Sequence, residues 1–312
     1  MSGPDETVAR ELSALGLDPA AVTDLVELAL TEDLGPAPGR DLTSEAAVPA
    51  EEVRPVALVA LEDGVVAGLV LLPLVTAAAA RRLGLPAPEV ELDADEGDEV
   101  SAGEVIAVVT GRTRVVLAAA GTALDLVRHL SGVATATRAW VEAVAGTGVQ
   151  VLDTRRTTPG LRALEQHAVR CGGGATKRRG LHDAAVVGPA HAAAAGSVAA
   201  AHDAVRRAFP DVVVQVRVDD PAGAAEAVGA GARFLLCEGL GPDALRAVVD
   251  AVRALAPPGG ERVEVEARAG SDVAGAGALA RTGVDFLSAT ALTGRAAALE
   301  VGLALDPPQG LR

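Results

Sequence analysis

The stretch VVVQVRVDDPAGAAEAVGAGARFLLC (residues 212–237) places two short apolar runs on either side of a segment with helical character. Residues 212–218 and 234–237 are rich in β-branched or bulky apolar side chains, which is typical of buried strands. Between them, Asp220 precedes Pro221, and proline is favoured in the first turn of a helix. A strand, a helix and a second strand in this order predict two parallel strands joined by a crossover, so the sequence predicts an α/β fold.

The same alternation continues through the second half of the chain. Thr158 and Gly241 also precede prolines, so helices are expected to start there as well. This repeated order fits an irregular six- or seven-stranded α/β barrel, which we expect over residues 131–293. The predicted strands are residues 149–152, 184–187, 212–218, 234–237, 263–265 and 284–287.

The first part of the chain has a different pattern. Apolar residues at helical spacing predict a helix over residues 21–34, and a long helical stretch follows over residues 113–130. Between them, β-branched residues 55–70 are split by Asp63-Gly64, which is a strong signal for a two-residue hairpin in an antiparallel sheet. We therefore expect an N-terminal α/β sandwich domain over residues 1–130.

The composition excludes several kinds of partner. The 312 residues carry a net charge of −15, which argues against a nucleic-acid or anionic membrane surface, because phosphates attract basic faces. Residues 1–17 contain acidic side chains and no apolar signal-peptide core, so a cytoplasmic protein is expected. No metal-ligand spacing is evident for Cys171, Cys237, His129, His167, His182 or His202.

Positive charge is concentrated in one window. Residues 151–180 contain seven cations and two carboxylates, so this window has a charge of about +5 in an acidic chain. Lys177 is the only lysine of the protein. Like charges at this density are unfavourable unless solvent or a ligand matches them, which indicates an anion site.

The position of the window supports that interpretation. Thr154, Arg155 and Arg156 directly follow the predicted strand 149–152, and ligands of an α/β barrel bind at the carboxyl ends of its strands. Arg162 lies in the helix expected from Thr158, whose amides could attract phosphate. The alternative is that these arginines only solvate the surface beside a glycine loop.

At this window the sequence is recognisable. LDTRRTTPGLRALEQHAVRCGGG (residues 152–174) resembles the quinolinate phosphoribosyltransferase family, whose members convert quinolinate into nicotinate mononucleotide. The resemblance covers nearly the whole chain. It extends to TEDLG (31–35) with DLTS (41–44), EDGVVAG (62–68), LSGVATATRAW (130–140) and TGVDFLSATALT (282–293).

The resemblance implies an N-terminal α/β sandwich completed by residues 294–312, an α/β barrel, and a homodimer whose active sites take residues from both subunits. The implied reaction, part of NAD biosynthesis, transfers the phosphoribosyl group of phosphoribosyl pyrophosphate to quinolinate, an aromatic dicarboxylic acid. Pyrophosphate and carbon dioxide are lost, and Mg²⁺ assists. Arginines are expected at the carboxylates and phosphates, and acidic residues at the ribose and the metal.

Several site residues carry over from the family by position. Thr154-Arg155-Arg156 matches its Thr-Arg-Lys triplet, Arg178 matches the arginine of its His-Arg pair, and Lys177 replaces that histidine. Glu238 replaces an aspartate, and we expect it to be the catalytic residue and the magnesium ligand. The predicted substrate-binding residues are Thr154, Arg155, Arg156, Arg162, Lys177, Arg178, Arg217, Arg268, Ala269, Gly270, Ala289, Thr290 and Ala291.

Other positions depart from the family pattern. Gly121 replaces a helix arginine that reaches the neighbouring subunit, Gly188 replaces a lysine, and Arg217 replaces a glutamate. Arg268-Ala269-Gly270 stands for the phosphate-binding Ser-Gly-Gly turn, and Ala289-Thr290-Ala291 for a Val-Gly-Ala segment. Losing a buried partner of a charged ligand costs about 2–5 kcal/mol, so these changes bear directly on the activity.

Three functions therefore stay open at this point. The first is phosphoribosyl transfer to quinolinate. The second is a catalytically silent paralogue that binds a phosphorylated anion or associates with an intact family enzyme and regulates it. The third is phosphoribosyl transfer to another heterocyclic acid.

Overall fold

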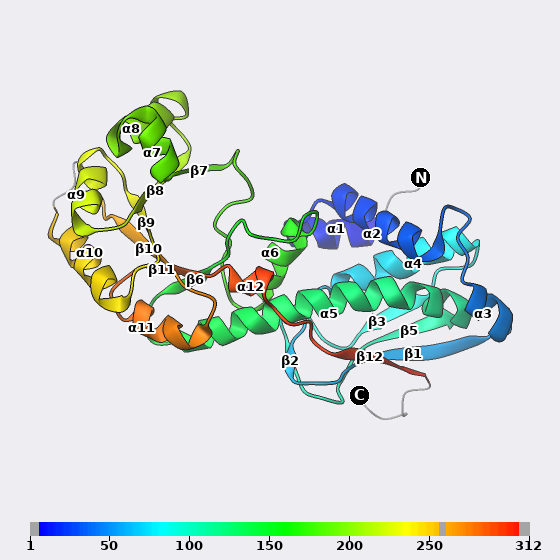
Figure 1. Ribbon diagram of the computed structural model, residues 1–312. Helices are drawn as coiled ribbons and strands as arrows, with labels where there is room; N and C mark the ends of the chain where they lie inside the picture. Colours follow the sequence, from blue (N-terminus) through cyan, green and yellow to red (C-terminus); the bar gives the residue numbers. More distant parts are fainter. Residues whose placement is uncertain (1–5, 256–259, 306–312) are drawn as a thin grey trace. The chain divides into compact units, whose positions relative to one another are not determined.

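The computed structural model describes residues 6–255 and 260–305, which form two compact units (Figure 1). Unit 1 contains residues 1–136, 159–172 and 296–312, and unit 2 contains residues 137–158 and 173–295. The end of the predicted completing tail, residues 306–312, lies outside the described residues. The domain bounds expected from the sequence stay a prediction.

Unit 1 is built on an antiparallel sheet of four strands in the order β12-β1-β5-β3. The last described strand of the chain, β12, pairs with β1 along its whole length, from Leu305 opposite Val56 to Val301 opposite Ala60. The elements of unit 1 are α1 (Glu6–Ala14), α2 (Pro19–Leu34), α3 (Leu42–Ala47), β1 (Val53–Ala60), β2 (Gly64–Val65), η1 (Leu69–Leu71), α4 (Leu72–Leu83), β3 (Glu89–Leu92), β4 (Glu99–Val100), β5 (Val105–Arg112), α6 (Arg162–Cys171) and β12 (Val301–Leu305).

The hairpin expected at Asp63-Gly64 is wrong, although the antiparallel sheet is confirmed. β1 pairs with β12 and β5, whereas β2 pairs with β4. The carboxylate of Asp63 accepts the N–H of Ala102 at 2.9 Å, in the turn before β5. Asp63 therefore ties two distant turns together and does not reverse the chain into a neighbouring strand.

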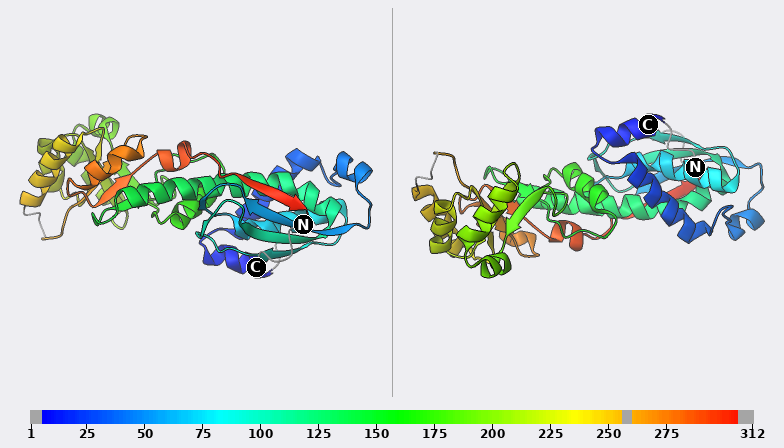
Figure 2. Two further views of the ribbon diagram at one scale, coloured as in Figure 1. Left: turned by 90° about the horizontal axis from the view of Figure 1, so that it is seen from below. Right: turned by 90° about the horizontal axis from the view of Figure 1, so that it is seen from above.

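The long helix α5 (Thr113–Ala143) begins where the sequence predicts it and extends beyond residue 130. Its first part runs alongside the four strands of unit 1 in each view (Figures 1 and 2). Gly132 allows the segment before β12 to approach this helix, because a Cβ atom at that position would lie 2.0 Å from the carbonyl oxygen of Ala297. A side chain here would push this segment away from the helix.

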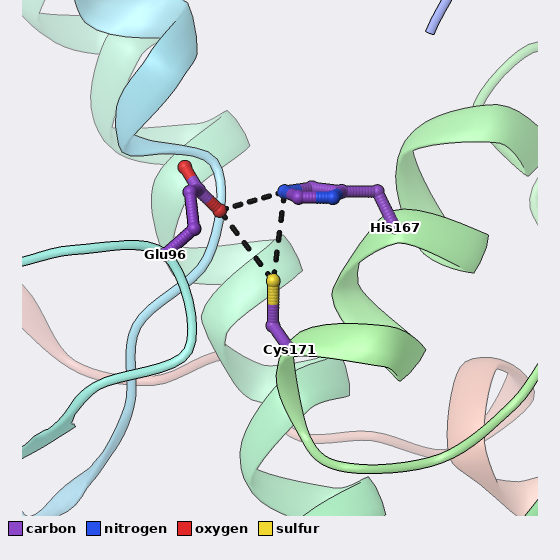
Figure 3. A group of neighbouring side chains, drawn as sticks. All are labelled: Glu96, His167 and Cys171. Atoms are coloured by element: carbon purple, nitrogen blue, oxygen red, sulfur yellow. Dashed lines mark hydrogen bonds and ion pairs between the residues drawn. The ribbon is translucent and has the colours of Figure 1, made fainter. Parts of the chain in front are cut away.

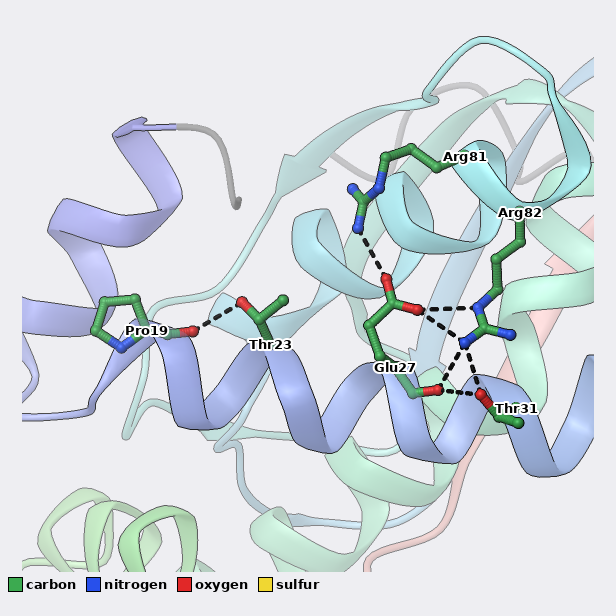
Figure 4. Close-up of polar contacts among 6 residues, drawn as sticks. All are labelled: Pro19, Thr23, Glu27, Thr31, Arg81 and Arg82. Atoms are coloured by element: carbon green, nitrogen blue, oxygen red, sulfur yellow. Dashed lines mark hydrogen bonds and ion pairs between the residues drawn. The ribbon is translucent and has the colours of Figure 1, made fainter. Parts of the chain in front are cut away.

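A polar network joins α2 to the end of α4 (Figure 4). Glu27 pairs with Arg81 at 3.0 Å and with Arg82 at 2.8 Å, and Arg82 also donates to the Thr31 hydroxyl at 2.6 Å. Thr23 donates to the carbonyl oxygen of Pro19 one turn earlier in α2. Because the guanidinium of Arg82 is largely buried, this network fixes how the two helices pack.

Unit 2 contains six parallel strands in the order β6-β11-β10-β9-β8-β7, which confirms the predicted strands. Among the described residues, β6 and β7 stand at the two ends of this hydrogen-bonded order. The strands are β6 (Gln150–Leu152), β7 (Ala184–Val187), β8 (Val213–Val218), β9 (Phe234–Glu238), β10 (Glu264–Arg268) and β11 (Phe286–Ser288).

The helices of unit 2 follow the strands in the chain, and those from α7 to α11 pack against one another in sequence order (Figure 1). They are α7 (Pro189–Ala195), α8 (Val198–Ala208), α9 (Pro221–Gly229), α10 (Pro242–Ala254), α11 (Ala276–Ala280) and α12 (Ala291–Gly294), with η2 (Val273–Gly275). The predicted starts at Pro221 and Pro242 are confirmed. The start expected at Thr158 is wrong, because residues 159–161 form a turn and α6 begins only at Arg162.

Candidate active site

The carboxyl ends of the unit 2 strands surround a cavity of about 550 Å³. Thr154 follows β6, Arg217 lies near the end of β8, and Glu238 and Arg268 are the last residues of β9 and β10. We call this space the cationic cavity, because its charged lining residues are Arg155, Arg156, Lys177, Arg178, Arg217, Glu238 and Arg268. Most of the predicted site is thus brought together in one concavity.

The loop after β6 presents two arginines to this cavity. Thr154 is buried, and its hydroxyl accepts the N–H of Arg156 at 3.1 Å. The hydroxyl of Thr293 donates to the carbonyl oxygen of Arg156 at 2.5 Å, so the loop is fixed at both sides. The side chains of Arg155 and Arg156 are exposed, which leaves them accessible to an anion in solution.

Lys177 has a different role from the one its charge suggested. Its ammonium group lies 2.6 Å from Oε2 of Glu266, a fully buried carboxylate that also accepts from Nε2 of Gln215 at 2.7 Å. Burial lowers the pKa of Lys177, and the nearby Glu266 opposes that shift. Most of this lysine's charge is therefore compensated inside the protein, below the floor of the cavity.

Sequence reasoning missed Glu266 and Gln215 altogether. The sequence EVEAR (264–268) alternates polar and apolar residues, which indicates a polar face that carries Glu266, whereas Val265, Glu266 and Ala267 are all buried. Its partner Lys177 lies 89 residues earlier, and nothing in a single sequence indicates such a pairing.

Arg178 lies deeper than the two loop arginines. Its guanidinium donates to the carbonyl oxygen of Ala184 at 2.8 Å. Burial, and next the positive charge of Arg155, lower its pKa. Two like charges held near each other in this way favour an anionic ligand between them.

Glu238 is held between two guanidinium groups. Its Oε2 accepts from Nη1 of Arg217 at 2.9 Å, and its Oε1 lies 3.7 Å from Nη1 of Arg268. Arg217 also donates to Asp219 at 3.2 Å. The contacts of Glu238 form a bridge across the ends of three adjacent strands, and with Asp219 included its two guanidinium groups are matched by two carboxylates.

A second cavity of about 390 Å³ shares Glu238 and Arg268 with the first. Of the predicted phosphate-binding residues, it is lined by Arg268, Ala269, Gly270, Thr290 and Ala291. Sequence reasoning missed four of its lining residues, Gly239, Ser271, Gly294 and Arg295. The Glu238–Arg268 pair is therefore a common wall between two neighbouring spaces.

Two predicted site residues line neither of these cavities. Ala289 is fully buried behind the strand ends. Arg162 begins α6, which belongs to unit 1, so the first-turn amides of this helix start at Arg162 and not at the expected Thr158. A ligand-binding role for either residue stays a prediction.

His191 lines the cationic cavity from the first turn of α7. Its Nδ1 accepts the N–H of Gly188 at 3.1 Å, so the imidazole is used to cap the start of this helix. Asp220 caps the start of α9, since it accepts the N–H of Gly223 at 2.7 Å. Cys237 is buried, and burial raises the pKa of its thiol to about 12, so it is unreactive.

The residues present do not fit a magnesium ion held by Glu238. Magnesium prefers oxygen ligands, mainly carboxylates and water. Glu238 is the only carboxylate that lines the cationic cavity in the described part of the chain, and both its oxygens face guanidinium groups. A cation at Glu238 would have to displace Arg217, so no catalytic step is assigned to a protein-held metal.

Six cations and one carboxylate line this cavity of an α/β protein, at the edge of the parallel sheet where ligands of such folds bind. Models of one protein family match both parts of the chain. The N-terminal domain of quinolinate phosphoribosyl transferase matches residues 41–131, and the C-terminal domain matches residues 133–304. The chain belongs to the quinolinate phosphoribosyltransferase family.

Individual relatives support this assignment. The chain is 37% identical over 285 residues to a nicotinate-nucleotide pyrophosphorylase (carboxylating) of Mycobacterium leprae, covering 91% of this chain and 97% of the relative. A probable enzyme of that name from Methanothermobacter thermautotrophicus is 32% identical over 90% of this chain and 97% of its own. The solved nicotinate-nucleotide pyrophosphorylase of Francisella tularensis superposes with a TM-score of 0.81 at 27% identity, covering 92% of this chain and 96% of that one.

No helix within the described ranges has both the length and the apolar character that crossing a membrane requires.

Proposed function

We propose that the protein transfers the phosphoribosyl group of phosphoribosyl pyrophosphate to quinolinate. The ring nitrogen bonds to ribose C1 as the bond from C1 to pyrophosphate breaks, and the electron pair leaves with pyrophosphate. The carboxylate next to the nitrogen then leaves as carbon dioxide, and a proton takes its place on the ring. The observation that carries this proposal is the cationic cavity in a chain that is otherwise acidic.

The charge of the cavity suits both substrates. Quinolinate is a dianion and phosphoribosyl pyrophosphate is a polyanion, so together they need several cations. Arg155 and Arg156, which are exposed, and Arg178, deeper in the cavity, are the groups we assign to carboxylate and phosphate oxygens. The second cavity, with Arg268 and the backbone around Gly270, is the space we assign to a further phosphate.

Glu238 is the group we assign to the reacting carbon. Positive charge develops at ribose C1 as pyrophosphate leaves, and a preorganised carboxylate stabilises it. Glu238 is the cavity's carboxylate among the described residues and stands at the wall between the two spaces. A substrate phosphate that binds Arg217 or Arg268 would release this carboxylate from its present partners.

The direct test is product formation by purified, folded protein. Quinolinate and phosphoribosyl pyrophosphate are expected to yield nicotinate mononucleotide, with carbon dioxide and pyrophosphate in equal amounts. The variant E238Q keeps the shape of the side chain and removes its charge, so its kcat should fall by roughly 10²-fold or more, the range seen when one transition-state partner is removed. Absence of product at high enzyme concentration would reject the proposal.

A second candidate rests on the Arg217–Glu238–Arg268 bridge. With both oxygens of Glu238 engaged, the cavity is adapted to hold an anion more clearly than to stabilise a cation. The same protein would then bind a phosphorylated ligand without turnover, alone or beside an intact family enzyme. A ligand-dependent rise in melting temperature together with no product would favour this candidate, and activity on a different heterocyclic acid would favour a change of substrate.

The oligomeric state belongs to the same proposal. We propose a homodimer, in which the neighbouring subunit contributes to each site. Light scattering on the purified protein should give twice the mass of the 312-residue chain. A monomer that retains full activity would contradict a shared site.

A further inference from the structure

Three side chains of unit 1 point toward one another (Figure 3). Glu96, His167 and Cys171 each offer one ligand atom, and these atoms all lie within 4.8 Å of one another. Nε2 of His167 is 2.7 Å from Oε2 of Glu96, and Sγ of Cys171 is 3.6 Å from that oxygen and 3.5 Å from that nitrogen. A carboxylate, an imidazole and a thiol therefore point at one small space.

Two elements hold this cluster in place. His167 and Cys171 lie four residues apart on α6, so they project from the same face of the helix. Glu96 lies in the turn between β3 and β4, and its two oxygens accept the N–H groups of Gly68 and Val70, each at 2.9 Å. Such contacts behind a ligand fix its orientation, as the partners of metal ligands generally do.

The backbone permits this close approach at one glycine. Gly97 has a backbone φ of +94°, which residues with a side chain rarely adopt. A Cβ atom at this position would lie 3.1 Å from the carbonyl oxygen of Cys171. The turn that carries Glu96 can therefore lie directly against the end of α6. Burial is high as well, since the side chain of His167 is only 4% exposed and that of Glu96 is 16% exposed.

The three distances can be compared with those around a tetrahedral zinc ion. With Zn–S of about 2.3 Å and Zn–N or Zn–O of about 2.0–2.2 Å, sulfur lies roughly 3.5–3.6 Å from each other ligand atom. The two sulfur distances of Cys171, 3.5 and 3.6 Å, already have these values. The N–O distance of 2.7 Å is that of a hydrogen bond and would open to roughly 3.4 Å on metal binding.

A hydrogen bond between His167 and Glu96 does not by itself explain why Sγ of Cys171 lies beside both groups. The Glu96–His167 hydrogen bond is complete without it, and a thiol is a weak donor and a weak acceptor. A divalent cation would replace the thiol proton, bind Nε2 of the neutral imidazole, which keeps its proton on Nδ1, and match the charge of the carboxylate.

We propose that Glu96, His167 and Cys171 bind a divalent cation such as Zn²⁺ or Co²⁺, with a water molecule as the fourth ligand. Mixed sulfur, nitrogen and oxygen ligands suit Zn²⁺ and Co²⁺ and do not suit Mg²⁺ or Ca²⁺. The site joins α6 to the β3–β4 turn, and none of its residues lines the cationic cavity. Its residues are distinct from those assigned to the proposed transferase activity.

Cobalt is the most direct probe, because Co²⁺ bound by a thiolate has a charge-transfer absorption that Co²⁺ bound only by oxygen and nitrogen lacks. Metal-free, full-length protein should bind one equivalent of Co²⁺ with this band. The band should be lost in C171S and kept in C237S, which removes the other cysteine. Absence of the band in the wild type, or its persistence in C171S, would overturn the proposal.

Stability and metal content give a second readout. Added Zn²⁺ should raise the melting temperature of the wild type and of C237S, and leave that of E96Q unchanged. If C171S or E96Q fails to fold, native mass spectrometry of the wild type decides the question. One tightly held zinc that competes with Co²⁺ would support the site, and a metal-free mass at micromolar zinc would exclude it.

Discussion

Glu266 and Lys177 form the most buried ion pair among the site residues, and that burial decides what each does. The carboxylate is fully buried and the ammonium side chain is 9% exposed. Desolvation of both charges offsets much of their attraction, so the pair adds little net stability, but loss of one partner leaves an uncompensated charge. We therefore assign the pair to the shape of the cavity floor and not to ligand binding.

The variant E266Q tests this assignment. It leaves the ammonium of Lys177 buried without a counter-charge, which should lower the free energy of unfolding by about 3–5 kcal/mol. Chemical denaturation measures the change. The double variant K177M/E266L removes both charges and should be more stable than E266Q, and an equal loss in both variants would contradict a charge-pairing role.

Arg217 and Arg268 are expected to control whether magnesium binds at Glu238. The wild type should bind free Mg²⁺ too weakly to measure by calorimetry, because both oxygens of Glu238 face guanidinium groups. Removing both arginines in R217A/R268S should make binding measurable, and E238Q in that background should abolish it. Strong Mg²⁺ binding by the wild type would show that the bridge opens readily.

Among the elements, α3 gives the clearest example of local sequence control. Asp41 accepts the N–H groups of Thr43 and Ser44 at 3.0 and 3.1 Å, and the hydroxyl of Ser44 donates to its other oxygen. Burial by itself would raise the pKa of Asp41, but these hydrogen bonds outweigh it and lower the pKa below its usual value of 3.8. Because the pKa of Asp41 is lower in the folded state, its carboxylate stabilises the fold above the usual pKa of 3.8. This stabilisation is lost as the pH falls through the folded-state pKa.

The variants D41A and D41N separate capping from charge. D41A should lose about 1 kcal/mol of stability at neutral pH, because it removes an N-cap. D41N keeps a capping oxygen but lacks the charge, so it should be less stable than the wild type at neutral pH and approach the wild type below about pH 4, where Asp41 becomes protonated. Thermal melts across this range measure both effects, and parallel curves for the wild type and D41N would contradict the role of the charge.

The six strands of unit 2 and the helix starts at Pro221 and Pro242 could be predicted because the local signal decides them. Apolar β-branched runs form strands almost wherever they are buried, and proline in a first turn needs no distant partner. The hairpin predicted at Asp63 and the helix start predicted at Thr158 rested on equally clear local signals, and both predictions were wrong. Asp63 is used by the distant Ala102, and the residues after Thr158 form a turn before α6.

The candidate site also contains features that could be predicted from the sequence and features that could not. The cavity at the strand ends follows from the α/β order, so Arg155 and Arg156 after β6 could be predicted to face it, whereas Arg178, Arg217 and Arg268 were expected there from the family resemblance. Which guanidinium pairs with which carboxylate could not, because the partners lie tens of residues apart. For the same reason, the approach of Glu96 to His167 and Cys171 has no signature beyond the four-residue spacing on α6.

On the scale of the whole molecule, charge is distributed very unevenly. A chain of net charge −15 places six cations around one cavity, so its surface repels anions in general while one site attracts them. Affinity for a polyanionic substrate should therefore fall as the salt concentration rises. The size of this fall should be set by the cations of that site alone. The family assignment, the fold and this cavity together support one account of the protein.

The most direct test of that account is the dissociation constant for phosphoribosyl pyrophosphate, measured by calorimetry for three proteins. R155A/R156A removes two arginines of the cationic cavity, and R206A/R207A removes two adjacent, exposed arginines of α8 that do not line it. The account predicts that R155A/R156A weakens binding by at least tenfold, since each charge-assisted hydrogen bond contributes about 1.5–3 kcal/mol, while R206A/R207A matches the wild type. Equal affinities for all three proteins would contradict it.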